Sequence, residues 1–591
     1  MARWIKLFRI ILNLSIRPFN GNIIFFVFAY LVIIGESVIE YFAYTPKYIE
    51  VFIDIYVICI LINLCHTKVR PWLRFGITTI IYVMAIAQYF CFHYFGTIFT
   101  PTVVQIISET NPEEASNFFE TYLTRELLSS RIMLFPILLA MQIIVLLKDK
   151  LYSSLKLSTK IQEVFGIGVI IVLILGSYTY VSNKLHFINL ISQDDVYGIE
   201  KSRNDTFGDG MYAPLYNIIY SVRANQLAYK QINQLIEVSS KPHDIRLNSN
   251  SQNIILVIGE SYNKYHSQLY GYNLETTPNQ INRIRNGELF NFTDVVSPWN
   301  LTSNAFKLLF SLYSIGDDND WSSYALFPAL FKSAGYTVFF LSSQFAVKNS
   351  ADTSHFAGGF FINNKTLSDL MFSYRNDNNY QDDGGLLDDY NTLRSNGTSK
   401  NLFIFHLVGQ HYSYSNRFPK AYTKFTAIDY KDKKLDNDKI EIMANYDNAT
   451  FYNDYILNEI IKLFEKENSV VIYLADHGEE VFEEDGFAGR RHPVQLTPTI
   501  AKYEFGIPFW IWYSDVFAEN HSNIIEQTKK SVNRKIMSDD LPHLLLYLGG
   551  INCDEYQSDH NIIDSTYHES RPRLLRGNED YDMLISSSPH L

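Results

Sequence analysis

Residues 253–261 read NIILVIGES, and residues 469–477 read SVVIYLADH. Each stretch is an apolar, β-branched run that ends in side chains able to bind a metal ion. Two further runs have the same apolar character, YTVFFLS at 336–342 and LFIFHLVG at 402–409. Runs of this kind are typical of strands that are buried on both faces of a mostly parallel sheet. Residues 251–591 are therefore predicted to form a soluble α/β/α domain.

Polar side chains gather at the ends of these predicted strands, where open parallel sheets bind their ligands. Glu260 follows the first strand, His411 follows the third, and Asp476 and His477 follow the fourth. Carboxylate oxygens and imidazole nitrogens bind Zn²⁺ at about 2.0–2.2 Å. Glu260, Asp476 and His477 therefore form a candidate metal site, with a fourth position left open as catalytic zinc requires. A hydrogen-bonded Asp–His turn without a metal is the structural alternative.

The first 185 residues have the pattern of a membrane domain. Five apolar runs approach the roughly 20 helical residues that span a bilayer, at 23–41, 49–65, 75–95, 132–147 and 164–182. Basic residues gather in the N-terminal tail and in the 66–74 and 148–160 loops. The positive-inside rule then predicts a cytoplasmic N-terminus, with everything after about residue 183 outside. The predicted domains are 1–185 (transmembrane), 186–250 (bridging helices) and 251–591 (catalytic).

Two features of the membrane domain are unusual. Residues 101–120 begin apolar and become acidic, which predicts a helix on the outer membrane surface. Glu36, Glu40 and Asp54 lie near the predicted outer ends of the first two spans. Acids at such depths face a partner or a wet cavity, so they indicate either a site for a cationic ligand or ordinary interfacial placement.

Composition excludes several classes of protein. The 591 residues carry 50 Lys and Arg against 62 Asp and Glu, a net charge of −12, which argues against a nucleic-acid partner. A hydrophobic fraction of 47% excludes a disordered chain. The four cysteines form no C-x-x-C pair, which argues against Cys-rich zinc sites and a disulfide framework. The Asn- and Asp-rich stretch 374–400 is predicted to be a solvated loop rather than a calcium site.

Five strings occur in a specific order along the chain: VIGESYNKYHSQLYGYNLETTPN (257–279), SPWNLTSNAFKLLFS (297–311), FHLVGQHYSYSNRFP (405–419), YDNATFYNDYILNEII (446–461) and YLADHGEE (473–480). With these strings and the five apolar runs, nearly the whole chain resembles the phosphoethanolamine transferases of the Gram-negative inner membrane. Those enzymes belong to the alkaline phosphatase and sulfatase superfamily. The resemblance implies an alkaline phosphatase-like domain in the periplasm.

The resemblance also assigns roles to residues around a zinc site with one ion, or two. Glu260 resembles the metal-binding Glu of the family's GES string, and Asp476 and His477 resemble the remaining ligands. Thr302 falls at the family's nucleophilic Thr, which is itself a metal ligand. A threonine hydroxyl is a poor nucleophile until a base or metal activates it. Attack by Thr302 on phosphatidylethanolamine would release diacylglycerol and leave phosphoethanolamine on its oxygen.

Further residues fall at the family's substrate positions. His411 and His492 resemble two histidines on the substrate side, where imidazole can protonate a leaving oxygen or deprotonate an acceptor. Thr110 and Glu114 fall where the family has a Thr and a Glu near the donor headgroup. Ile106 stands where the family has an Asn, so this chain departs from the family in that helix.

The resemblance implies lipopolysaccharide as the acceptor, in a monomeric enzyme among inner-membrane lipids. Lipid A-modifying members carry several disulfides and a Cys-Gly-Thr string, whereas this soluble domain has Cys553 alone. The branch that modifies the heptose phosphate of the core is therefore favoured, with lipid A or a periplasmic glucan as alternatives. Glycerol-phosphate transfer on the same fold, and a non-enzymatic transporter or sensor, are the other hypotheses. No C-x-P-x-R or S-x-P-x-R string for a formylglycine sulfatase occurs.

Other hydroxyl and imidazole side chains lie in the same strings. Ser297 and Ser303 compete with Thr302 as nucleophiles. Ser261 is a third competitor, although a strand-end hydroxyl that bonds the backbone is the favoured interpretation. His266 and His406 are interpreted as structural.

Overall fold

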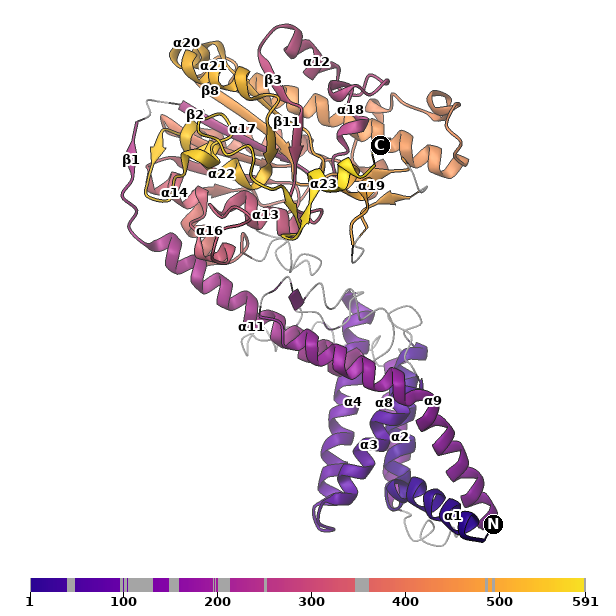
Figure 1. Cartoon of the computed structure of the whole chain (residues 1–591). Helices are drawn as coiled ribbons and strands as arrows, with labels where there is room; N and C mark the ends of the chain where they lie inside the picture. The colour runs from indigo at the N-terminus through magenta and orange to yellow at the C-terminus, as the bar shows by residue number, and fades with distance from the viewer. Residues whose placement is uncertain are drawn as a thin grey trace. The chain divides into compact units, whose positions relative to one another are not determined.

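The computed structural model describes residues 2–39, 48–95, 99, 104, 131–147, 159–194, 196, 198–199, 213–248, 252–345, 361–483, 487–491 and 495–588. The chain divides into two compact units, Met1–Tyr229 and Lys230–Leu591. Figure 1 labels many of the helices and some of the strands.

The first unit is helical. Its helices are α1 (Ala2–Ile16), α2 (Ile23–Ile39), α3 (Tyr48–Leu64), α4 (Arg70–Phe95), α8 (Leu134–Leu147), α9 (Thr159–Ile191) and the start of α11 (Ala213–Ser240). Helix α2 contacts α3, α4 and α8, and α9 contacts α1 and α3. Aromatic rings fill the centre, where Phe19 packs against Phe26 and Tyr56. Each of the five predicted apolar runs therefore contains a helix.

The predicted count of five spans is not confirmed by helix length. Two described helices are long and apolar enough to cross a membrane, Arg70–Cys91 and Lys160–Ile191. The pair Lys6–Phe19 and Ile23–Gly35, bent by 69°, would make a third span. Helices α3 and α8 fall short because they have 17 and 14 residues.

Several predicted features of the membrane domain lie outside the described residues. They are Glu40, the side chain of Glu36, and all of the predicted surface helix 101–120 except residue 104.

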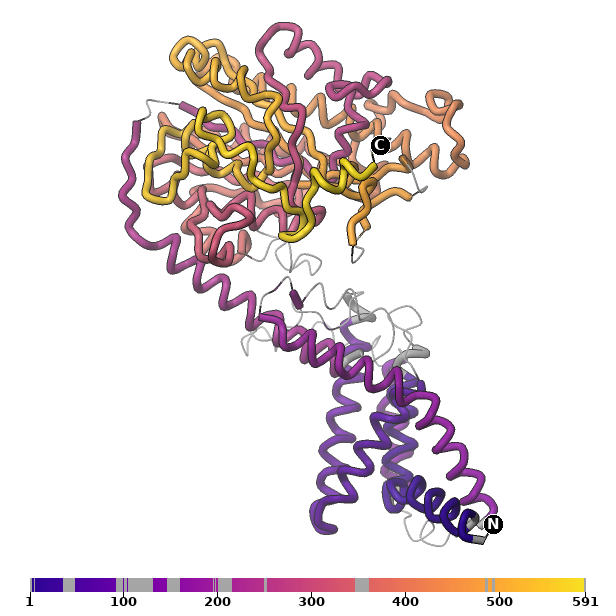
Figure 2. Tube along the Cα trace, in the orientation of Figure 1, coloured from indigo at the N-terminus to yellow at the C-terminus, as the bar shows by residue number. Residues whose placement is uncertain are grey.

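The second unit is built on a seven-stranded sheet (Figure 1). In spatial order its strands are β3 (Leu289–Phe292), β11 (Phe509–Tyr513), β8 (Ser469–Ala475), β2 (Gln252–Gly259), β7 (Lys400–His406), β5 (Thr337–Ser342) and β6 (Tyr374–Arg375). The strands from β8 to β6 are parallel, whereas β11 is antiparallel to β8 and to β3. Figure 2 shows the magenta trace of β2 beside the orange trace of later strands. The prediction of a mostly parallel sheet is confirmed, and the sheet is mixed.

Helices cover this sheet and exclude water from its strands. The helices of the unit are α12 (Pro278–Arg285), α13 (Thr302–Phe310), α14 (Phe327–Ser333), α16 (Lys365–Met371), α17 (Gly384–Leu393), α18 (Asn437–Phe464), α19 (Pro498–Ile500), α20 (Asp515–Asn520), α21 (Ser522–Ser531), α22 (Leu541–Leu548) and α23 (Tyr581–Ser586). Helices α13 and α14 contact α22, and α12 and α17 contact α18. Every residue of β2 and β8 is buried, which accounts for their continuous apolar sequences.

Short strands complete the unit: β1 (Arg246–Leu247), β4 (Asp294–Val296), β9 (Glu480–Val481), β10 (Ala488–Gly489), β12 (Lys535–Met537), β13 (Ile551–Asn552), β14 (Leu574–Leu575) and β15 (Glu579–Asp580). The prediction of a solvated loop at 374–400 is wrong, because the stretch contains β6 and α17. Its Asp383 is buried and accepts hydrogen bonds from Ser343 Oγ and from the backbone N–H of Val408 and Gly409. These donors compensate part of the loss of water around the carboxylate.

Candidate active site

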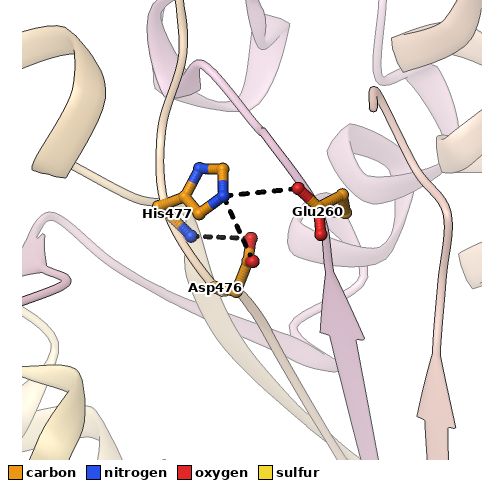
Figure 3. A group of neighbouring side chains, drawn as sticks. All are labelled: Glu260, Asp476 and His477. Carbon is orange, nitrogen blue, oxygen red and sulfur yellow. Dashed lines mark hydrogen bonds and ion pairs between the residues drawn. The ribbon is translucent and has the colours of Figure 1, made fainter. Parts of the chain in front are cut away.

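The sheet brings three of the predicted metal ligands together. Strands β2 and β8 are neighbours, with Gly259 opposite Ala475, so the next residues of both strands emerge at the same edge. Glu260, Asp476 and His477 are fully buried there, and their metal-binding atoms all lie within 4.8 Å of one another (Figure 3). His477 Nε2 lies 3.3 Å from Glu260 Oε1 and 3.3 Å from Asp476 Oδ2. The predicted proximity of these side chains is therefore observed.

The loops after both strands are tied to each other by backbone contacts. Tyr262 N–H donates to the His477 carbonyl oxygen, at 3.0 Å. His477 N–H donates to Asp476 Oδ1 at 2.8 Å, which fixes the carboxylate beside the imidazole. A Cβ atom on Gly478 would lie 2.2 Å from the Tyr503 carbonyl oxygen, so the D-H-G string requires glycine for close approach.

Thr302 lies beside the same three side chains. Its Oγ is 3.1 Å from Glu260 Oε2 and 3.2 Å from His477 Nε2. Thr302 is also the first residue of helix α13, which has nine residues. The positive end of a helix dipole favours negative charge, here an alkoxide on Oγ and the oxygens of a bound phosphoryl group. The predicted nucleophile thus adjoins the predicted metal ligands.

The protonation state of His477 suits metal binding. Its Nδ1 lies 2.8 Å from the Gly478 carbonyl oxygen, which can only accept, so Nδ1 carries the proton and Nε2 presents a lone pair. Burial, helped by the nearby Arg490 guanidinium, lowers the pKa of His477 and keeps the ring neutral. Two carboxylates, one neutral imidazole and one hydroxyl are donors that zinc accepts. The residues present therefore fit a divalent cation.

The two carboxylates respond to burial in opposite ways. Burial raises the pKa of Asp476 well above its ordinary value, and the charge of Glu260 raises it further. Burial also opposes ionisation of Glu260, but the positive side of its surroundings, which includes the Arg490 guanidinium, holds its pKa well below the usual range. Two acids that share one site ionise together only when a cation neutralises them.

Two residues that the sequence analysis missed contact this set. Arg490 Nη1 lies 2.7 Å from His477 Nε2, and its Nε lies 3.6 Å from Glu479 Oε2. Gln344 Nε2 donates to Glu260 Oε2 at 3.3 Å. The GRRHP string around His492 contains Arg490, so its basic pair was an available signal, whereas a lone Gln gives none.

The remaining predicted substrate residues are only partly described. His411 follows β7 and is half-buried. Its loop is held near Glu260 because Gln410 N–H donates to the Glu260 carbonyl oxygen at 3.1 Å. His492, Thr110 and Glu114 lie outside the described residues.

The competing serines occupy different positions. Ser261 Oγ donates to Glu260 Oε1 at 2.8 Å, so the interpretation of a hydroxyl that bonds the backbone is wrong. Ser297 is fully buried, and its Oγ donates a hydrogen bond of 2.6 Å to the Asp476 carbonyl oxygen. This hydroxyl therefore stabilises the backbone at Asp476. Ser303 follows Thr302 in α13 and is 8% exposed.

The two histidines interpreted as structural are buried. His266 Nδ1 lies 2.6 Å from Asp447 Oδ1, and its Nε2 lies 3.3 Å from Glu483 Oε1. His406 lies between Ser342 Oγ, at 2.9 Å from Nδ1, and Gln344 Nε2, at 3.3 Å from Nε2. His406 therefore supports the Gln344 side chain that contacts Glu260.

Comparison with curated proteins confirms the resemblance predicted from the sequence. Phosphoethanolamine transferase EptC of Escherichia coli K12 is 27% identical over 348 residues, covering 56% of this chain and 57% of EptC. Phosphoethanolamine transferase EptA of Helicobacter pylori is 31% identical over 288 residues, covering 48% of this chain and 51% of EptA. The chain thus spans little more than half the length of the curated relatives it matches.

A solved structure shows the same fold in the second unit. The C-terminal periplasmic domain of EptC from Escherichia coli, in complex with Zn, superposes with a TM-score of 0.51 at 24% identity. The superposition covers 58% of this chain and 96% of that domain.

Two family models match separate parts of the chain. The model for phosphoethanolamine transferase EptA/EptB matches residues 55–188. The sulfatase model matches residues 252–551, which contain Glu260, Thr302, Asp476 and His477. Because that match covers more than half of the 591 residues, the chain belongs to the sulfatase family.

Proposed function

We propose that this chain is a phosphoethanolamine transferase that moves the group from phosphatidylethanolamine to lipopolysaccharide through a covalent intermediate on Thr302. The observation that carries the proposal is the position of Thr302 Oγ, 3.1 Å from Glu260 Oε2 and 3.2 Å from His477 Nε2 at a helix N-terminus. The choice of phosphoethanolamine as the transferred group is based on the relatives, which are named phosphoethanolamine transferases.

Glu260, Thr302, Asp476 and His477 are the proposed ligands of one zinc ion. A zinc ion held there would favour the Thr302 alkoxide and offset negative charge on the phosphoryl oxygens. Glu260 and Asp476 supply oxygen ligands, and His477 is held in the required tautomer by its Nδ1–H bond to Gly478. The superposed EptC domain was solved with Zn, which supports this choice of metal.

The reaction proposed for the chain has two displacements. In the first, Thr302 Oγ forms a bond to phosphorus while the phosphorus–oxygen bond to diacylglycerol breaks. In the second, an acceptor oxygen attacks the same phosphorus and Thr302 is released. His411 and His492 are proposed to give a proton to the leaving diacylglycerol oxygen and to take one from the acceptor. Thr110 and Glu114 are proposed to contact the donor headgroup.

Membrane placement is part of the proposal. Helices α2, α3, α4, α8 and α9 would be five spans, with the N-terminus in the cytoplasm and residues 251–591 in the periplasm. Residues 1–185 would lie in the bilayer that contains the donor lipid. Residues 186–250 would link this membrane domain to the catalytic domain. The enzyme would act as a monomer on the inner membrane. The proposed acceptor is the heptose phosphate of the lipopolysaccharide core, with lipid A or a periplasmic glucan as alternatives.

Transfer by the purified chain tests this proposal. The zinc-loaded full chain is incubated with phosphatidylethanolamine that carries an isotopic label in its ethanolamine, together with lipopolysaccharide, and the products are analysed by mass spectrometry. Labelled phosphoethanolamine on the core heptose region is expected. A mass increment of glycerol phosphate, from phosphatidylglycerol supplied in parallel, would assign the other phosphotransfer instead. Failure to modify any acceptor would contradict the proposal.

A further inference from the structure

The guanidinium of Arg490 lies beside the metal-ligand set, by which we mean Glu260, Asp476 and His477. Its Nη1 is 2.7 Å from His477 Nε2, and Thr302 Oγ is 3.2 Å from that same nitrogen. Thr302 and Arg490 therefore both lie within hydrogen-bond distance of one atom. The Arg490 side chain is 20% exposed, so part of the group remains accessible to a ligand.

Arg490 is held in place by a buried carboxylate. Its Nε lies 3.6 Å from Glu479 Oε2, and Glu479 is 3% exposed. The Tyr414 hydroxyl donates to the other oxygen of Glu479, which fixes that carboxylate. Arginine stays charged in proteins, so this arrangement places a permanent cation beside the nucleophile.

The charges around His477 show that Arg490 and a metal complement one another. Glu260, Asp476 and Glu479 carry three negative charges when ionised, and Arg490 carries one positive charge. A divalent cation together with Arg490 offsets more of this negative charge than either one alone. The site is therefore built to hold both positive groups together.

A metal and Arg490 use the same atom of His477. Nε2 has a single lone pair, which accepts the Arg490 N–H here and would bind the metal in the loaded protein. The N–H that loses this acceptor then needs another one. A phosphoryl group on Thr302 supplies oxygen acceptors within reach, because the guanidinium and the Thr302 oxygen already flank one nitrogen.

We propose that Arg490 binds the oxygens of the phosphate that Thr302 attacks. A guanidinium presents two parallel N–H groups, which match two phosphate oxygens. The ligand class is a phosphate monoester or diester, and the inference rests on the proposed function of this site. Among the described arginines nearby, Arg417 instead donates to backbone carbonyls of His411 and Tyr412, and Arg491 pairs with Glu480.

Phosphate binding by the full chain tests this inference without transfer activity. The zinc-loaded protein in detergent is titrated by calorimetry with inorganic phosphate and, separately, with O-phosphoethanolamine, and zinc content is measured by mass spectrometry of the metal. Arg490→Gln is expected to weaken both ligands at least about tenfold, since a charge-assisted bidentate contact is lost. Arg490→Lys keeps a cation for Glu479 and is expected to lie between wild type and Arg490→Gln.

The matched control is Arg491→Gln, which removes the same charge one residue along the chain. It is expected to bind both phosphate compounds as the wild type does. Wild-type affinity of zinc-bearing Arg490→Gln for both compounds would overturn the inference, even if the chain proves to be a transferase. Loss of zinc and phosphate together in Arg490→Gln, with both restored in Arg490→Lys, would also overturn it, by assigning Arg490 to charge balance alone. Weakened phosphate binding in a protein that transfers nothing would leave the inference standing and contradict the proposed function.

Discussion

Two buried clusters of the second unit contain the same residue types and differ in how their charges are satisfied. The metal-ligand set joins His477 to Glu260 and Asp476, and the His266 network joins His266 to Asp447 and Glu483. Both clusters are buried. The pKa values of their histidines are nevertheless shifted in opposite directions.

In the His266 network every charge has a partner. The ring nitrogens of His266 face Asp447 and Glu483, and Tyr272 and Tyr430 donate to Asp447 Oδ2 at 2.8 Å and 2.5 Å. Burial opposes a charge on His266, but the charge of Asp447 prevails and raises the pKa to about 10. The network is complete as a charged imidazole with its acids, so it is a structural element.

In the metal-ligand set the imidazole nitrogen that lies beside the two carboxylates carries a lone pair instead of a proton. Burial lowers the pKa of His477, and burial raises that of Asp476. Three groups that all offer electron pairs require a cation between them. The comparison shows that the presence of His, Asp and Glu does not identify a functional site, whereas the direction of their lone pairs and protons does.

The largest expected effect separates Thr302 from its neighbour. Thr302→Ala is expected to lower transfer at least about 1,000-fold, because removal of a nucleophile leaves only binding and electrostatic contributions. Part of the zinc should remain bound. Ser303→Ala is the matched control and should retain transfer. The assay is labelled phosphoethanolamine transfer, and an active Thr302→Ala protein would assign the nucleophile elsewhere.

Neutralising one acid in each cluster should have opposite consequences. Asp447→Asn leaves the charged His266 short of its main partner and is expected to cost about 4 kcal/mol of unfolding free energy. Asp476→Asn removes a carboxylate that burial disfavours, so the metal-free protein should be as stable as wild type or more stable. Denaturant unfolding of the metal-free chain checks both. Equal losses of unfolding free energy in the two variants would contradict the proposed difference between the two clusters.

Zinc should stabilise one of these two variants and not the other. Ligand that binds only the native state raises the unfolding temperature. Zinc is expected to raise the unfolding temperature of wild type and of Asp447→Asn but not of Asp476→Asn. An unchanged zinc response in Asp476→Asn would remove Asp476 from the ligand set.

The pH dependence of stability should reveal the His266 network. The folded pKa of about 10 lies above the ordinary 6.5, so the contribution of His266 is complete below pH 6.5 and is lost as pH rises toward 10. Between pH 6.5 and 8.5 the loss is expected to be about 2.5 kcal/mol, at about 1.4 kcal/mol per pH unit. Unfolding titrations of wild type and His266→Gln measure it. The same pH slope in both proteins would contradict this assignment.

Asp383 is an intermediate case, because the groups that donate hydrogen bonds to it are neutral, and it should show the smallest effect. Burial raises its pKa to about 6 from an ordinary 3.8. An acid whose folded pKa is raised loses its contribution as pH rises, here between pH 4 and 6, by about 2 kcal/mol. Asp383→Asn should flatten that part of the stability profile. A steeper profile in the variant would show that the carboxylate is stabilised rather than strained.

Much of the second unit follows from its sequence. Strands β2, β5, β7 and β8 were predicted within a few residues, because buried parallel strands need continuous apolar runs. The antiparallel strand β11, FWIWY at 509–513, was missed. It is short and aromatic, and its antiparallel direction depends on contacts with β8 and β3 that are distant in the chain.

The candidate site divides in the same way. Glu260, Asp476 and His477 follow strands, and strand ends are predictable positions, so these residues could be proposed together. Arg490 follows β10 of a short hairpin, and only tertiary structure brings it to His477. Asp383 was misjudged because its sequence is polar, while its burial depends on backbone N–H groups from another loop.

The central claim is that Thr302 accepts a phosphoethanolamine group beside a bound divalent cation. Zinc-loaded protein is mixed with ethanolamine-labelled phosphatidylethanolamine without acceptor, quenched in acid, and its peptides are analysed by tandem mass spectrometry. The account predicts the labelled group on Thr302 and its disappearance when lipopolysaccharide is added before the quench. Label on Ser261 or Ser303 instead, or transfer to lipopolysaccharide with Thr302 unmodified throughout, would contradict it.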